Sequence, residues 1–395
     1  MNRRDFLKLS AAAPLAASSF SLHAAPAGNP RLLVVFMRGA YDAANLLVPH
    51  GSSFYYEARP NIAIPRPGAA ANSALALDAT WALHPSLRAS LLPLYEKGQL
   101  AFVPFAGTDN LSRSHFETQD SIELGQGQDR ARSYQSGFMN RLASVLAKRG
   151  QPIAFTGQVP VAFRGDVQVP NVALRQLARP SVDARQSAVI AEMYRNTALA
   201  GPVMEGFSTR DGVIQTLAED MDAASRNALT ARGFELEARR IARLMRDRYN
   251  LAFVDIGGWD THVGQGGAEG YLANRLEELG RGVAAYADEM GGAWNDTVVV
   301  VISEFGRTFR ENGNRGTDHG HGSAYWVLGG GVRGGRIAGE QVALTPATLN
   351  QSRDYPVLNE YRALFAGLFG RMYGLDAAQT ERVFAGVKPK DFGLV

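Results

Sequence analysis

Five short apolar runs constrain the fold of this chain more than any other feature of its sequence. The first, Leu-Leu-Val-Val-Phe-Met over residues 32–37, has no polar interruption, which is typical of a strand buried on both faces. Similar runs cover 101–105, 251–256, 297–303 and 324–328. Segments with helical patterns separate several of these runs. This alternation predicts an α/β fold in which a mostly parallel sheet is sandwiched by helices.

We expect a single domain over residues 30–395, because no linker rich in proline, glycine and serine divides the chain. Helices are expected at 87–97, 130–150 and 270–290 from the spacing of their apolar residues. Helical patterns are dense at about 125–250, so this stretch is expected to form a helix-rich elaboration, either an insertion or a cap. No segment beyond the first 25 residues is long and apolar enough to predict a stable membrane span.

The N-terminus has the three parts of an export signal. Residues 1–25 combine Arg3 and Arg4, a moderately apolar stretch and small residues at a possible cleavage site. The pattern Arg-Arg-x-Phe-Leu-Lys resembles the twin-arginine signal, so we expect the twin-arginine export machinery as a partner and a periplasmic or secreted mature protein. The alternative is an ordinary secretory peptide in which the two arginines occur by chance.

Charge and cysteine content exclude several classes of function. The chain has 41 Lys and Arg against 38 Asp and Glu, a formal net charge of +3, so it lacks the basic field typical of nucleic-acid-binding proteins. It contains no cysteine, which excludes disulfides, thiolate metal sites and cysteine nucleophiles. Chemistry in this protein must therefore rely on carboxylates, imidazoles, hydroxyls and guanidinium groups.

Acidic residues and histidines gather where the predicted strands end. Asp42 follows the first run, Asp260 and His262 follow 251–256, and Glu304 follows 297–303. His319 and His321 precede the run at 324–328. Ligands of open α/β sheets bind outside the carboxyl ends of the strands. Neutral imidazoles with carboxylates are the usual ligands of zinc, manganese or iron, so these six residues are candidate metal ligands.

Each candidate also has a purely structural interpretation. Asp260 and His262 could cap the loop and helix that follow them, and the segment 318–321 could be a polar turn. Glu304 could form an ion pair with Arg307 or Arg310 at the surface. Asp42 could be an ordinary turn residue, whereas two further histidines, His50 and His84, are expected to have structural roles only.

Ser114 lies at the predicted start of a helix, where a capping role does not exclude a catalytic one. With Glu117 three residues later, it matches a capping box. The same position offers free amides and the positive end of a helix dipole to an anion.

Five motifs together resemble the bacterial family known as domain of unknown function 1501. They run from the first strand to the last third of the chain, so the resemblance covers nearly the whole mature protein. The motifs are Phe-Met-Arg-Gly-Ala-Tyr-Asp at 36–42, Arg-Ser-His-Phe at 113–116, Gly-Trp-Asp-Thr-His at 258–262, Ser-Glu-Phe-Gly-Arg-Thr at 303–308 and Asp-His-Gly-His-Gly at 318–322. That family is in turn similar to the alkaline phosphatase and sulfatase superfamily.

The resemblance implies an alkaline-phosphatase-like fold and an exported metal-dependent hydrolase of phosphate or sulfate esters, acting on a small-molecule or polymer substrate. One or two divalent ions, zinc, manganese or calcium, would be held by Asp42, Asp260 with His262, Glu304, and His319 or His321. Ser114 would be the nucleophile. Arg113, Arg38 or Arg307 would hold ester oxygens, and His115 or a remaining histidine would serve as an acid.

The sequence departs from the superfamily pattern at several positions. Glu304 and Phe305 stand where an Asp-His pair is expected, and Asp260 and His262 are closer together than usual. A non-catalytic, metal-stabilised binding or assembly protein that works with an exported protein partner is therefore a second hypothesis. Another metal enzyme, such as a phosphoglycerate-mutase-like transferase or a lyase, is a third.

Overall fold

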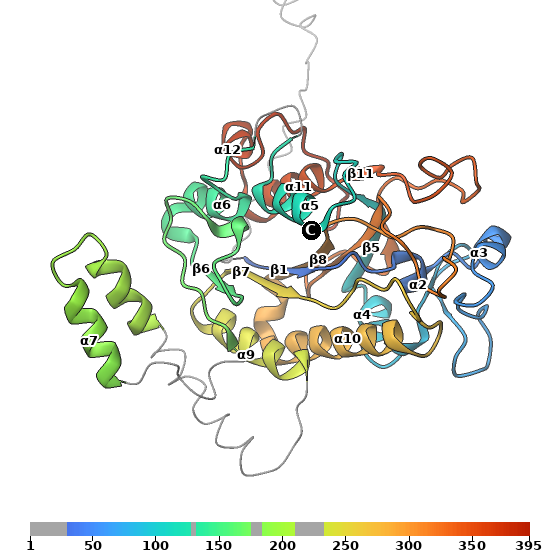
Figure 1. The fold of residues 1–395 in the computed structure, drawn as a ribbon, viewed down its shortest axis with the longest axis horizontal. Coiled ribbons are helices and arrows are strands. Elements are labelled where there is room, and N and C mark those ends of the chain that lie inside the picture. The colour runs from blue at the N-terminus through green and yellow to red at the C-terminus, as the bar shows by residue number, and fades with distance from the viewer. Residues whose placement is uncertain (1–29, 128–131, 175–183, 210–232) are drawn as a thin grey trace, which may run out of the picture.

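A mixed sheet forms the centre of the computed structural model, which describes residues 30–127, 132–174, 184–209 and 233–395 (Figure 1). Within these residues the sheet has eight strands in the order β10-β5-β9-β8-β1-β7-β6, with β11 also paired to β5. The strands are β1 (Arg31–Met37), β5 (Leu100–Gly107), β6 (Pro152–Phe155), β7 (Leu251–Ile256), β8 (Thr297–Ser303), β9 (Ser323–Leu328), β10 (Arg336–Ile337) and β11 (Asn359–Glu360). All five strands expected from apolar runs are present.

The strand register brings several loops to one edge of the sheet. β1 pairs in parallel with β7 and β8, and Met37 is level with both Ile256 and Ser303, so these three strands end side by side. β9 is antiparallel to β5 and to β8. The start of β9 therefore lies at the edge where its neighbours end. The predicted mostly parallel sheet is confirmed, with β9 as an antiparallel exception.

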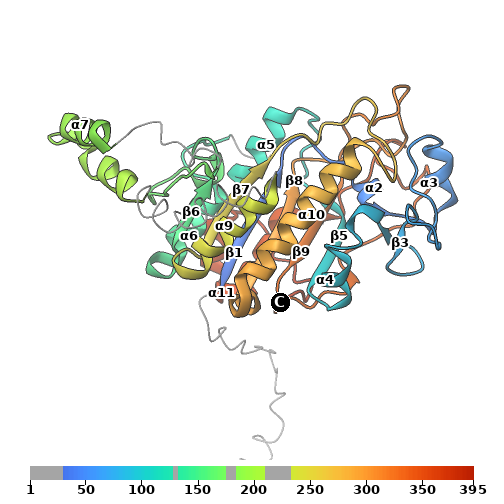
Figure 2. The same cartoon turned by 90° about the horizontal axis from the view of Figure 1, so that it is seen from below.

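Helices cover both faces of the sheet because the central strands bury side chains in both directions. In β1, Leu33 and Val35 belong to one apolar core, and Leu32 and Val34 belong to another. Helices α9 and α10 pack on the first core and α6 and α11 on the second, as Figures 1 and 2 show. The bounds of these helices and of their neighbours are α5 (His115–Leu124), α6 (Phe138–Leu146), α9 (Phe234–Asp247), α10 (Tyr271–Met290), α11 (Tyr361–Tyr373) and α12 (Ala377–Val383). The predicted sandwich is confirmed.

Smaller elements extend this arrangement. The helix expected at 87–97 is confirmed only in its second half: a 3-10 turn (Pro85–Leu87) comes first, and the short helix α4 (Leu92–Glu96) follows, with Pro93 at its start. The helix expected at 130–150 is limited to α6, which Gly137 precedes. The remaining elements are α2 (Ala43–Leu46), α3 (Ser53–Ala58), α7 (Ala184–Tyr194) and a small antiparallel sheet of β2 (Leu47–Val48), β4 (Ala82–Leu83) and β3 (Leu75–Ala76).

The predicted signal peptide, residues 1–25, lies outside the described residues, as do parts of the elaboration expected at 125–250. Among the helices that are described, none combines the length and the apolar character needed to cross a membrane. The division of the chain into one domain with a cap stays a prediction.

Candidate metal centre

The candidate centre is built from four segments that meet at the edge where β1, β7 and β8 end. Asp260 and His262 follow β7, Glu304 follows β8, and His319 lies in the segment that enters β9. His115 is the first residue of α5. Close backbone contact brings these segments together: a Cβ on Gly39, which has a φ of +121°, would lie 2.8 Å from the backbone nitrogen of Asp260.

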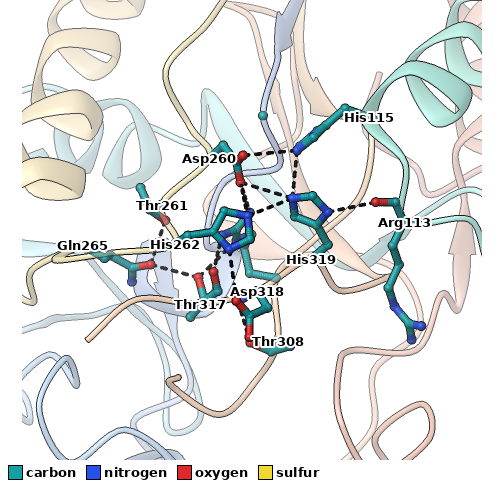
Figure 3. Close-up of polar contacts among 12 residues, drawn as sticks. Arg113, His115, Asp260, Thr261, His262, Gln265, Thr308, Thr317, Asp318 and His319 are labelled. Atoms are coloured by element: carbon teal, nitrogen blue, oxygen red, sulfur yellow. Dashed lines mark hydrogen bonds and ion pairs between the residues drawn. The ribbon is translucent and has the colours of Figure 1, made fainter. Parts of the chain in front are cut away.

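Three imidazole rings and one carboxylate converge at a common point (Figure 3). The Nε2 atom of His319 lies 2.9 Å from Nε2 of His115 and 3.0 Å from Nε2 of His262. One oxygen of Asp260, Oδ1, lies 3.3 Å from Nε2 of His319 and 2.9 Å from Nε2 of His262. The other, Oδ2, lies 3.5 Å from Nε2 of His115. Four side chains thus offer potential ligand atoms around a small space.

The opposite nitrogen of each ring is held by an oxygen acceptor. Nδ1 of His115 contacts Oε1 of Glu304 at 2.8 Å, Nδ1 of His262 contacts Oδ1 of Asp318 at 3.0 Å, and Nδ1 of His319 contacts the carbonyl oxygen of Arg113 at 2.9 Å. Ionised carboxylates and carbonyls only accept hydrogen bonds, so each Nδ1 carries the proton. The Nε2 atoms then present lone pairs to the shared point, as metal-ligating histidines do.

The carboxylates around the rings stay ionised. Burial alone would raise the pKa of Glu304, but hydrogen bonds from His115 and Gln119 outweigh it and lower the pKa overall. Burial would also raise the pKa of Asp318, and hydrogen bonds from Asn312 and His262 reverse this effect. Negative charge therefore remains at both positions and favours a proton on Nδ1 of the adjacent rings.

Without an ion, the contact between the Nε2 atoms of His115 and His319 needs one shared proton. The pKa of His115 is raised, chiefly by its hydrogen bond to Glu304. The pKa of His319 is lowered, chiefly by burial. A cation that binds both rings must displace this proton.

The donor set fits a divalent transition metal. Atoms that share a tetrahedral cation with bonds of about 2.0–2.1 Å are separated by about 3.3 Å, which is close to the spacings in this cluster. His115, Asp260 and His319 together meet the geometric requirement for one ion. The side chains of Asp260 and His262 are 41% and 40% exposed, so the cluster is open to solvent.

Glu304 supports this cluster from behind. Its side chain is fully buried, and its carboxylate accepts hydrogen bonds from His115, from Nε2 of Gln119, from the Gly39 amide and from the Ser303 hydroxyl. The structure therefore places it as the residue that orients His115, not as a surface partner of Arg307 or Arg310.

Asp42 and His321 lie outside the group of converging atoms. Asp42 is buried and caps α2, and both of its oxygens are bound by the guanidinium of Arg59. His321 is also buried, and its pKa is lowered by burial and by the charge of Arg113. Of the six predicted ligands, the structure thus brings together Asp260, His262 and His319, with His115 as an added member.

Ser114 is exposed and lies between two residues that contact His319. It is the N-cap residue of α5, but its side chain makes no capping hydrogen bond, so the predicted capping box is wrong. The Glu117 carboxylate instead accepts hydrogen bonds from the Ser112 hydroxyl, at 2.7 Å, and from Arg132. The Ser114 hydroxyl is therefore not engaged in capping the helix.

The three arginines that were expected to hold ester oxygens are engaged within the protein. Arg113 contributes its carbonyl to the centre, but its guanidinium points away and contacts Asp354 at 3.2 Å (Figure 3). Arg38 contacts Asp255, Glu123 and Gln119, and Arg307 contacts Asp260 and Thr317. Their guanidinium groups hold the loops around the centre.

Sequence reasoning missed two residues of the site, Asp318 and Gln119. Asp318 stood within a quoted motif, but its role as a partner of His262 depends on the loop that precedes β9. Gln119 lies four residues after His115, which places both on one face of α5. That spacing was the one available signal.

Comparison with known proteins gives a family. The family model described as "Protein of unknown function (DUF1501)" matches residues 29–384. The chain belongs to the DUF1501 family. The matched range of this DUF1501 protein contains every residue of the candidate centre, and the resemblance predicted from the motifs is confirmed. Curated proteins give no significant match.

Solved structures similar to this DUF1501 protein share little sequence with it. A protein in the alkaline phosphatase superfamily from Vibrio parahaemolyticus has a TM-score of 0.39 and 10% identity, over 88% of this chain and 67% of that one. Ps i-CgsB in complex with k-i-k-neocarrahexaose has a TM-score of 0.37 and 8% identity, over 89% of this chain and 74% of that one. At such values the function must be argued from the site itself.

Proposed function

We propose that this DUF1501 protein is a metal-dependent hydrolase of phosphate or sulfate esters. The convergence of three imidazole Nε2 lone pairs on the Asp260 carboxylate carries the proposal. His115, Asp260 and His319 would hold one divalent ion, and His262 is an adjacent fourth donor. A bound divalent ion would polarise an ester oxygen and lower the pKa of an attacking hydroxyl.

The surroundings of the cluster support an anionic ester as substrate. α5 begins at His115, and its N-cap side chain leaves the first amides of the helix uncapped. The positive end of the helix dipole and these amides favour a phosphate or sulfate group. The exposed Ser114 hydroxyl is the nucleophile in this proposal. Its oxygen loses a proton to solvent and bonds to phosphorus or sulfur, while the bond to the leaving alcohol breaks and that alcohol gains a proton. Water then hydrolyses the Ser114 ester, which releases phosphate or sulfate and restores the hydroxyl.

His262 is the group best placed to protonate the leaving alcohol. It is more exposed than His115 and His319, whose side chains are 22% and 26% exposed, and Asp318 holds its Nδ1 atom. A ring fixed in this way can donate a proton from Nε2 when it is protonated. This role requires that His262 is not bound to the metal.

A second candidate function is a metal-stabilised binding or assembly protein without catalytic activity. The observation that favours it is the fourth donor: with His262 as a ligand, four protein atoms complete a tetrahedral shell, as in structural zinc sites. The engagement of Arg38, Arg113 and Arg307 within the protein also leaves these groups unavailable for an ester. An exported partner protein belongs to this proposal.

Export is part of both candidates. The twin-arginine pattern at Arg3 and Arg4 supports transport of the folded protein, with its metal already bound, to the periplasm or beyond. Changing both arginines to lysine should retain the protein inside the cell. Secretion at the wild-type level would contradict the twin-arginine proposal.

Metal analysis combined with an ester screen tests the function. Protein purified from cells without added metal should contain about one equivalent of a divalent ion, and it should hydrolyse an aryl phosphate, a phosphodiester or an aryl sulfate. Ser114→Ala should retain the ion and lose turnover, whereas the exposed Ser144→Ala in α6 is the matched control. Bound metal without turnover of any ester would favour the binding protein, and absence of metal would overturn both.

A further inference from the structure

We propose that Gln119, itself oriented by Arg38, is a positioning residue that fixes His115 for the metal centre. This inference rests on the proposed metal site and adds to it a hydrogen-bonded chain of side chains. This chain of hydrogen bonds begins at Arg38, just after β1, and passes through Gln119 in α5. It continues through Glu304, just after β8, and ends at Nδ1 of His115, the first residue of α5.

Each link of the chain is a short hydrogen bond. Nη1 of Arg38 donates to Oε1 of Gln119 at 3.0 Å. Nε2 of Gln119 donates to Oε1 of Glu304 at 2.8 Å. The same carboxylate oxygen accepts the proton on Nδ1 of His115, also at 2.8 Å. Gln119 thus connects a guanidinium to the carboxylate that holds the ring.

Chemistry permits only one orientation of the Gln119 amide. A guanidinium only donates hydrogen bonds and an ionised carboxylate only accepts them. The amide oxygen must therefore face Arg38 and the amide nitrogen must face Glu304. This removes the usual ambiguity between the two ends of a glutamine amide, and it makes Arg38 the group that sets the direction.

Arg38 is itself held in place by two acids. Its Nε atom contacts Asp255 at 2.6 Å, and its Nη2 atom contacts the buried Glu123 at 2.8 Å. The guanidinium also lies 4.8 Å from the ring centre of Phe36. A group fixed at three points transmits a defined orientation to Gln119. Outer partners of this kind orient metal-binding histidines in other proteins.

The opposing interpretation is that these contacts only join β1 to α5 and stabilise the fold. The two interpretations differ in what loss of the Gln119 amide does to a bound metal ion. Gln119→Glu places a second carboxylate against Glu304, and Glu304→Gln removes the charge that holds His115. If Gln119 positions His115, these changes alter the coordination of the ion. If the contacts only stabilise the fold, the changes lower the stability of the protein and leave the coordination as it was.

Zinc affinity and the visible spectrum of bound cobalt test the inference on the full mature protein. We expect Gln119→Leu, Gln119→Glu and Glu304→Gln each to weaken zinc binding about 10- to 100-fold in competition with a chelator. The cobalt spectrum should change in the same three variants, because His115 is displaced. Gln126→Leu, which removes a glutamine with two hydrogen bonds outside the centre, is the matched control and should behave as wild type.

Unchanged zinc affinity and an unchanged cobalt spectrum in folded Gln119→Leu would overturn the positioning role and leave the metal site intact. Weaker zinc binding in Gln119→Leu with the wild-type cobalt spectrum would also overturn it, because loss of stability without displacement of His115 is the result that a merely structural contact predicts. If the wild-type protein binds neither zinc nor cobalt, the proposed metal site fails together with this inference. Zinc binding without ester hydrolysis removes only the hydrolase.

Discussion

Asp42 and Asp260 follow adjacent strands of the same sheet, and the structure uses them in opposite ways. Each carboxylate contacts one arginine. Arg59 binds both oxygens of Asp42, and the Asp42 side chain is 1% exposed. Arg307 binds only Oδ1 of Asp260, and the Asp260 side chain is 41% exposed. The charge of Asp42 is therefore satisfied inside the fold, whereas Asp260 retains an oxygen for a ligand from solvent.

This difference distinguishes the structural Asp42 from Asp260, the proposed metal ligand, more clearly than their positions in the sequence do. The surroundings of Asp42 also include Gln265, which donates to its Oδ2 atom at 2.5 Å. A carboxylate with these donors gains little from a cation. The imidazole lone pairs around Asp260, by contrast, repel one another until a proton or a cation is bound.

The largest expected effect comes from breaking the closed pair, that is, the buried ion pair of Asp42 and Arg59. Arg59→Met leaves the buried Asp42 carboxylate without its partner, which should lower the free energy of unfolding by about 3–5 kcal/mol. Urea denaturation measures this change. Arg66→Met, which removes an arginine at the surface near Tyr56, should cost far less and serves as the control. Equal midpoints for the two variants would show that Asp42 and Arg59 do not form a closed pair.

The positions of the strands and of the acidic and histidine residues at their ends could be predicted, because a strand buried on both faces has a continuous apolar pattern. The role of each residue at a strand end could not. β9 is antiparallel, so His319, which precedes it, lies at the same edge as residues that follow β7 and β8. No pattern within a single strand reveals its direction.

Pairing between side chains that are distant in the sequence could not be predicted either. Arg59 lies 17 residues beyond Asp42 in a segment without periodicity, and only the fold shows that it binds both carboxylate oxygens. Glu304 looked like a ligand because it follows β8. Its side chain is instead completely buried and accepts hydrogen bonds from four donors, so it orients His115.

The next largest expected effect is a pH dependence of stability caused by His84, a buried histidine near Asp42 that lies outside the exposed cluster. His84 is buried, its Nδ1 atom accepts from the Ser86 amide and its Nε2 atom faces the Gly267 carbonyl, and burial lowers its pKa to about 4. The unfolded chain binds this proton near pH 6.5 and the folded chain only near pH 4. Stability contributed by neutral His84 is therefore full above about pH 6.5 and is lost as the pH falls to about 4, by about 3 kcal/mol.

Urea unfolding between pH 8 and pH 4.5 measures this dependence. His84→Gln should flatten the decline relative to the wild-type protein, and His50→Gln should leave it as in wild type. A decline of the same slope in His84→Gln would mean that other groups cause the acid sensitivity.

Removal of metal should lower the thermal stability of the protein only through the candidate metal centre around Asp260. An ion present at 100 times its dissociation constant stabilises the folded state by about 2.7 kcal/mol, so a chelator should lower the unfolding temperature of the wild-type protein. Asp260→Asn removes a ligand and should abolish the response. Calorimetry with zinc and with a chelator makes this comparison, and a chelator response that survives in Asp260→Asn would place the ion elsewhere in the protein.

The smallest effect concerns His262, which decides between the two proposed functions. Its side chain is 40% exposed, and its Nε2 atom contacts Asp260 and His319. It is the most exposed of the three imidazoles and acts as an acid, not as a ligand, in the proposed hydrolase. His262→Gln should therefore weaken zinc binding by no more than about tenfold, or about 1.4 kcal/mol. His319→Gln, at the middle of the cluster, should weaken it much more. If His262→Gln keeps the ion but loses ester turnover, the ring acts as an acid; if it loses zinc as completely as His319→Gln, the ring is a fourth ligand and the closed, non-catalytic site is favoured.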